Sequence, residues 1–164
     1  MLLTSAISKG QNTTSPSARD KKFIRLALED GNAEVAMGLL AVEKASSEDV
    51  KQFGQKIIED RTHLADQMRD VAEKEHLHAP RKIDPKDKTL EEKLRKLSGA
   101  SFDKTYIAAA VRDERRDLDE FNQEANHGND TAIKAAAGSG ALSIGGQLQA
   151  AERIARSHNV KTGY

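Results

Sequence analysis

The sequence contains no cysteine. Disulfide bonds, thiolate metal sites and cysteine nucleophiles are therefore excluded. Tryptophan is also absent, aromatic residues make up 4% of the chain, and there are three prolines. A buried core must consequently be built from alanine and aliphatic side chains. Abundant alanine, together with few prolines and few β-branched runs, favours helix.

The chain also lacks an excess of either charge and lacks any long apolar run. Lys+Arg and Asp+Glu number 26 each, so the formal net charge is zero. This balance argues against nucleic acid as a partner, because neutralising phosphates requires a basic surplus. No stretch approaches the roughly 20 apolar residues of a transmembrane helix. The first eight residues lack the basic segment of an intact signal peptide.

The distribution of polar and apolar residues predicts one domain of four long helices, preceded by a leader and followed by a tail. Residues 1–17 are polar and rich in helix breakers, which predicts a flexible leader. The domain spans 18–157, and a frayed tail follows at 158–164. Helical periodicity predicts four long helices, at about 18–45, 46–77, 100–126 and 129–156. Residue 46 and residue 129 are the approximate positions of the caps that begin the second and the fourth helix. A short helix is predicted through 85–97.

Local signals predict where these helices start and stop. Ser46 followed by Asp49 resembles a capping box, and Pro85 suits the first position of the short helix. Gly128 follows the third long helix, where a left-handed glycine is a common stop. Asn129 is then expected to cap the last helix.

The connections between the helices predict the fold class. Tight turns join the first helix to the second and the third to the fourth, so each pair is expected to form an antiparallel hairpin. The middle connection has about 21 residues, which is long enough to cross a bundle from end to end. We therefore predict an all-α, ferritin-like four-helix bundle with a short extra helix in the long crossover.

Each long helix places one long polar side chain on its apolar stripe. Positions seven residues apart share a helix face, and apolar or small residues flank each polar position at that spacing. The four positions are Glu34, Arg61, Glu114 and Gln147. They lie at matching heights, so we predict a central polar layer. Arg61 would bridge Glu34 and Glu114, because buried charges require pairing.

Two alternatives to a metal-free layer stay open. One is a metal site for Fe or Mn built from carboxylates and a histidine, as in ferritin-like di-metal proteins. Its candidate ligands are Glu34, Asp60, His63, Asp113 and Glu114. The other is that some of the polar residues lie at the edge of their stripe and reach water. Arg61 disfavours the metal site, since a guanidinium cannot ligate a cation and repels it.

The remaining polar features indicate structure more than chemistry. His76 and His78 are interpreted as a solvated helix end. The arginines and acids between 112 and 119 alternate in sign, which is typical of a solvated helix face. No nucleophile elbow or phosphate-binding glycine loop is present. The sequence therefore predicts no catalytic residues and no cofactor.

Several short motifs resemble one bacterial family. The matching residues are Ala33-Glu34-Val35, Val50, Phe53, Glu59-Asp60, Phe102-Asp103-x-x-Tyr106 and Val111-x-Asp113, within about residues 20–160. The Phe102-Asp103-x-x-Tyr106 segment is the most specific of these. On these motifs the chain resembles a family of unknown function labelled "predicted outer membrane protein" (domain of unknown function 4142).

The resemblance implies a ferritin-like fold and a secreted, periplasmic or cell-envelope location. The family pattern usually has histidines at three places, which here are Arg61, Glu114 and Gln147, so the site looks like a lost metal site. We expect a non-enzymatic helical bundle of unknown role, envelope-associated or stress-related, with unknown partners and a possible homodimer. The alternative is a ferritin-like metal-handling protein or oxidase.

Overall fold

The computed structural model describes residues 15–83 and 85–163. These residues form helices and connecting segments without any strand, which confirms the all-α prediction. The helices are α1 (Ala18–Lys44), α2 (Glu48–Lys74), α3 (Pro85–Arg95), α4 (Gly99–His127) and α5 (Thr131–Ser157). None of the helices in this part of the chain is both long and apolar enough to cross a bilayer.

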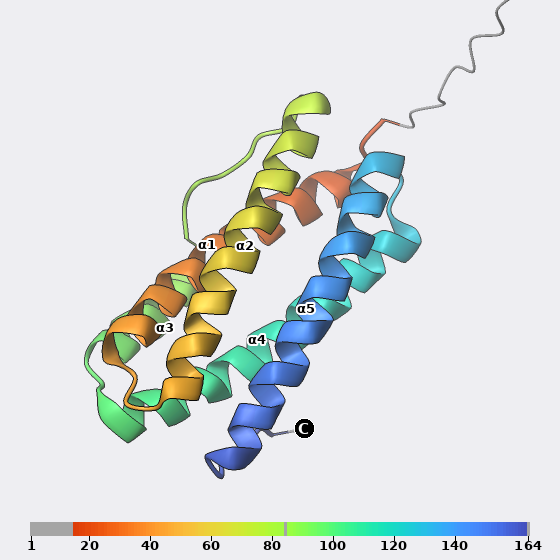
Figure 1. Cartoon of the computed structure of the whole chain (residues 1–164). Coiled ribbons are helices and arrows are strands. Elements are labelled where there is room, and N and C mark those ends of the chain that lie inside the picture. Colours follow the sequence, from red (N-terminus) through yellow and green to blue (C-terminus); the bar gives the residue numbers. More distant parts are fainter. Residues whose placement is uncertain (1–14, 84, 164) are drawn as a thin grey trace, which may run out of the picture.

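The four long helices pack as two antiparallel hairpins, as predicted. The closest packing joins α1 to α2 and α4 to α5, while α2 also contacts α5 and α1 contacts α4. The crossover between the hairpins runs back along the bundle, so that α2 and α4 point in the same direction (Figure 1). Its short helix, α3, packs mainly against α1. Hence α1 and α5 lie diagonally opposite each other.

The start of two helices differs from the sequence prediction. The predicted capping box at Ser46 and Asp49 is wrong: Ser47 precedes α2 and makes no side-chain capping bond. A capping box instead begins α1: the side chains of Ser17 and Asp20 each accept a hydrogen bond from the backbone N–H of the other residue. The cap of α5 is not Asn129 but the next residue, Asp130, whose carboxylate accepts from two backbone N–H groups.

Left-handed backbone occurs at other positions than predicted. Gly128 has a φ of −59°, so the expected left-handed glycine after α4 is wrong. His76 and Asn159 instead have φ of 54° and 52°. Each ends a helix with the paired backbone bonds of a Schellman motif. The residue after each, Leu77 and Val160, packs onto a core cluster.

The ends of the domain are more ordered than predicted. His158 lies 3.1 Å from the carboxylate of Asp49, and the N–H of Val160 donates to the last turn of α5. Residues 158–160 are therefore docked, and the prediction of a frayed tail is wrong for them. Most of the predicted leader, residues 1–14, lies outside the described residues. Within residues 15–17, the backbone carbonyl of Ser15 accepts a hydrogen bond from the side-chain amide of Asn129.

The core consists of two apolar clusters at the two ends of the bundle. One contains Met37, Phe53, Ile57, Phe102 and Ile107 among others, and the second contains Ile24, Leu28, Met68, Phe121 and Ile144 among others. On α2, α4 and α5 the polar position that the sequence singled out lies between these clusters, and on α1 Glu34 lies next to Ala33, where the first cluster begins. The polar layer therefore lies inside the core, between two apolar halves.

The left-handed histidine that ends α2 provides a test of this helix stop. A residue with a Cβ is strained in this conformation by roughly 1–2 kcal/mol, while glycine loses more chain entropy on folding. We expect His76→Gly to stabilise the fold by about 0.5–1 kcal/mol, measured by urea unfolding. His78→Gly is the matched control, because His78 is also exposed and does not have a positive φ. A destabilised His76→Gly variant would contradict the assignment.

Candidate functional site

Arg61 lies at the centre of the bundle with only 2% of its surface exposed. Its Nη2 atom donates to Glu114 Oε2 at 2.6 Å and to Glu34 Oε1 at 3.1 Å. Its Nε atom also contacts the second oxygen of Glu34. Asp117 Oδ2 lies 3.2 Å from Nη2. One guanidinium from α2 therefore holds carboxylates from α1 and α4 together.

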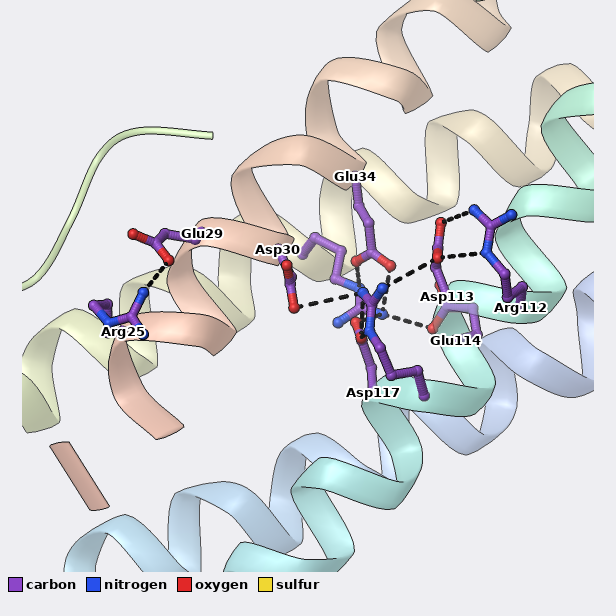
Figure 2. Close-up of polar contacts among 10 residues, drawn as sticks. Arg25, Glu29, Asp30, Glu34, Arg112, Asp113, Glu114 and Asp117 are labelled. Atoms are coloured by element: carbon purple, nitrogen blue, oxygen red, sulfur yellow. Dashed lines mark hydrogen bonds and ion pairs between the residues drawn. The ribbon is translucent and has the colours of Figure 1, made fainter. Parts of the chain in front are cut away.

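A second arginine extends this cluster toward the surface. Arg116 of α4 contacts Asp117 at 2.9 Å, Asp113 at 3.3 Å and Asp30 of α1 at 3.4 Å. Its side chain is 34% exposed, so it joins the buried layer to solvent. Arg112 lies further out and pairs with Asp113 at 3.2 Å. Figure 2 shows these carboxylates of α1 and α4 facing one another across the interface between the helices.

The structure brings together three of the four residues of the predicted layer. Glu34, Arg61 and Glu114 meet as described above. Gln147 is also buried, but its hydrogen bond goes to a different residue, since its Nε2 atom donates to Asp60 Oδ2 at 3.1 Å. The four residues are between 1% and 7% exposed. The alternative in which some of them reach water is therefore wrong.

Sequence reasoning missed several members of the cluster. Asp30 of α1 and Asp113 and Asp117 of α4 are at most 5% exposed, although the stretch of α4 around the last two was interpreted as a solvated face. That interpretation is wrong for Asp113 and Asp117, and Arg116 is half-buried between them. A usable signal was present, because Asp117 follows Glu114 by three residues and so lies on the same side of the helix.

The residues of the alternative metal site are not gathered around one point. His63 is exposed on α2, and Asp60 pairs with Lys56 at 2.5 Å and with Gln147. Between Glu34 and Glu114 lies the guanidinium of Arg61. In residues 15–83 and 85–163, no three histidine, aspartate or glutamate side chains are arranged to hold a metal ion.

A small cavity lies beside the charged layer. Its volume is about 20 Å³, and its walls include Glu34, Glu114, Met37, Phe53 and Tyr106. This is enough for about one water molecule and too little for an organic substrate. A water molecule in this cavity would be a polar neighbour of both glutamates, in addition to the guanidinium of Arg61.

Burial and pairing set the protonation states of the layer. Burial raises the pKa of Glu34 well above its usual value and that of Glu114 to about 7, although Arg61 opposes both shifts. Burial alone would lower the pKa of Arg61. The negative charges of Glu34, Glu114 and Asp117 outweigh the effect of burial, so the pKa of Arg61 is raised. Arg61 is therefore permanently charged, while burial favours the protonated forms of the two glutamates.

A second buried acid pair lies at the end of the bundle where α4 turns into α5. Asp20 accepts the backbone N–H groups of Asn129 and Asp130. Hydrogen bonds from Ser17, Glu124 and the backbone outweigh burial and lower the pKa of Asp20. Burial and the bond to Asp20 raise the pKa of Glu124 to about 7. This pair therefore also carries a proton near neutral pH.

Comparison with known proteins agrees with this architecture. The family model "Domain of unknown function (DUF4142)" matches residues 5–154. The chain belongs to the DUF4142 family. No curated protein shows significant sequence similarity to this DUF4142 chain. The family's "outer membrane" label stays a prediction.

Solved structures of DUF305 proteins share the ferritin-like helical fold of this DUF4142 domain. A DUF305 fragment from Deinococcus radiodurans superposes with a TM-score of 0.76 at 10% identity, covering 87% of this chain and 99% of that one. A DUF305 protein from Streptomyces coelicolor gives 0.75 at 15% identity, with 89% and 96% covered. At these identities the likeness establishes the fold alone.

The most specific sequence motif of this DUF4142 domain has a structural role. The carboxylate of Asp103 accepts three hydrogen bonds from the α1–α2 turn, from both the backbone and the hydroxyl of Ser46 and from the backbone of Ser47. The rings of Phe102 and Tyr106 stack at 5.8 Å inside the core. The motif therefore joins the start of α4 to the turn of the first hairpin.

Removing the central arginine tests how far the layer depends on it. We expect Arg61→Met to reduce the free energy of unfolding by about 3–5 kcal/mol at pH 8, because buried carboxylates lose their counter-charge. At pH 5 the loss is expected to be smaller, since those carboxylates can bind protons. Arg112→Met is the control, expected to cost about 1 kcal/mol or less at an exposed pair. Equal losses for the two variants would contradict the role of Arg61.

The raised pKa values predict a stability that depends on pH. Glu114 and Glu124 have pKa values of about 7 in the folded protein against 4.5 in the unfolded chain. The folded state therefore holds more protons between these values, and its stability falls as the pH rises through 7. The lowered pKa values of Asp20 and Asp49 stabilise the folded state above about pH 4. This contribution is lost as the pH falls below that value.

We expect the melting temperature to be higher at pH 5 than at pH 8, as measured by calorimetry at constant ionic strength. A Glu114→Gln/Glu124→Gln variant is the control, and its melting temperature should depend less on pH over this range. A wild-type melting temperature that rises from pH 5 to pH 8 would contradict the assignment.

Proposed function

We propose that this DUF4142 domain is a non-enzymatic helical scaffold that acts by binding other proteins. One observation supports this proposal above the others: a permanently charged guanidinium lies between Glu34 and Glu114, where ferritin-like relatives gather metal ligands. Charged Arg61 fills the position between the carboxylates and repels cations. The cavity beside it admits no organic substrate.

The central layer then serves to select one arrangement of the helices. Buried ion pairs contribute little net stability but disfavour arrangements that leave a charge unpaired. A shift of α2 by one turn would place Arg61 in an apolar half of the core, away from Glu34 and Glu114. The layer therefore favours a rigid bundle with a single helix register, which is suited to presenting a fixed surface.

We further propose a periplasmic or cell-envelope location and a stress-related role. The family label supports this location, and the DUF305 protein from Streptomyces coelicolor is described as a secreted-protein candidate. The absence of cysteine is compatible with an oxidising compartment, since no thiol requires protection.

The second candidate function is a ferritin-like metal-handling protein or oxidase that binds Fe or Mn. One observation favours it: five buried carboxylates surround the centre, from Asp30, Glu34, Asp113, Glu114 and Asp117. Such a site would require Arg61 to leave the space between Glu34 and Glu114, and it would recruit Asp60 or His63 from α2.

Metal content separates the two functions. We expect the protein, purified without chelators and then incubated with Fe(II), Mn(II) or Zn(II), to retain well below one metal ion per chain in elemental analysis. The physical reason is the repulsion between Arg61 and any cation at the layer. A near-stoichiometric metal content that disappears in Glu34→Ala/Glu114→Ala would establish the metalloprotein instead. Glu43→Ala/Glu73→Ala, at two exposed glutamates, is the matched control.

A further inference from the structure

The outer side of α5 differs in composition from the rest of the surface. Residues 135–151 contain no charged residue, although charged residues make up 32% of the chain. The exposed positions of this segment carry alanine, serine, glycine, glutamine and leucine. Depletion of charge is typical of the centre of protein interfaces, and the exposed side chains of this segment of α5 carry none.

One large apolar side chain projects from this surface beside a groove. Leu142 is 82% exposed, which is the highest value among the large exposed apolar residues of the described chain. Next to it, a groove of about 450 Å³ runs between α2 and α5. It is lined by Phe53, Gly146, Ala150 and Leu142 itself, and also by the charged residues Lys56, Asp60 and Arg153. The projection and the hollow therefore adjoin each other.

Gly146 has no internal reason to be glycine. A Cβ added there would meet nothing within 4 Å, whereas a Cβ at Gly140 would lie 2.5 Å from the ring of Phe121. Glycine inside a helix costs about 1 kcal/mol relative to alanine. Packing within the chain explains this cost at Gly140 but not at Gly146. Close approach of a second backbone from outside would explain it.

Gln147, one of the residues that line the groove, has a buried acceptor without a donor. Gln147 is 5% exposed, and while its Nε2 atom donates to Asp60, its Oε1 atom accepts no hydrogen bond from the described residues. A buried polar atom of this kind costs free energy unless a partner supplies a donor. The groove therefore has a mixed apolar and charged lining, and one of its residues has a buried oxygen that no group of the described chain satisfies.

We propose that the outer face of α5 and the adjoining α2–α5 groove bind a second copy of this chain. In this arrangement, two α5 helices cross antiparallel about a twofold axis near Ser143 and Gly146, and Leu142 of each copy enters the groove of the other. The same register places the hydroxyl of Ser143 from one copy next to Gly146 and Gln147 of the other. The inference deepens the proposed scaffold role and rests on it, because it names one partner of that scaffold.

Two observations favour a second copy over an unrelated protein. The projecting side chain and the hollow that would take it lie on the same face, which is the condition for a twofold, self-complementary interface. The chain also has a formal net charge of zero, so two copies approach without net repulsion.

The test is the mass in solution of the full chain, measured by sedimentation equilibrium from micromolar to submillimolar concentration. We expect the wild type to form a dimer with twice the 17.9 kDa of one chain. Leu142→Lys and Gly146→Glu should each weaken dimerisation at least tenfold, since each places a charge in the interface. Leu39→Lys is the matched control, because Leu39 is a 57% exposed leucine on α1, diagonally opposite α5.

A wild type that stays monomeric overturns the proposal, and so does a dimer that neither α5 variant weakens. Circular dichroism melts confirm that each variant is folded before its mass is interpreted. A metal-bound protein would contradict the proposed scaffold function without affecting this result, so the two failures are distinguishable.

Discussion

The guanidinium of Arg61 lies in the middle of a protein core, where a charge is tolerated only with partners that balance it. Its partners come from α1 and α4, so the first hairpin and the second are joined by charge as well as by apolar packing. Arg116 continues the network outward through Asp30 and Asp113. The helices can satisfy these bonds in one register only, and the rest of the bundle is arranged around that register.

The position of the layer also determines how the core is built. Apolar residues occupy the two ends of the bundle, and each end is closed by its own polar contact. At one end Asp103 holds the α1–α2 turn, and at the other Asp20 holds the α4–α5 turn. Both acids accept backbone N–H groups from a turn that belongs to the other hairpin. The bundle is therefore held across its hairpins at both ends and at its centre by carboxylates.

Carboxylates outnumber arginines in the central layer, and the protein accommodates the difference by holding protons. Glu34 and Glu114 have raised pKa values because burial disfavours their charged forms. A metal ion would balance the same excess of negative charge in a ferritin-like site. Here Arg61 supplies part of that positive charge and protons supply the remainder. On the proposed scaffold function the layer needs no cofactor, and the outer surface, including the uncharged face of α5, is the part of the molecule that binds a partner.

Helical periodicity and connection lengths were sufficient to predict the two hairpins, the crossover and the positions of Glu34, Arg61 and Glu114, because seven-residue spacing is a property of any single helix. The partners of these residues were not predictable in the same way. Gln147 lies on the predicted stripe yet turns to Asp60, and Asp117 joins Arg61 although its neighbours in the chain alternate in charge. The sequence by itself determined the apolar stripe of each helix and the polar position on it, but not that Asp113 and Asp117 are buried as well. Only the tertiary structure decided which of the polar side chains meet, because the rotation of neighbouring helices and the rotamers of long polar side chains depend on all four helices at once.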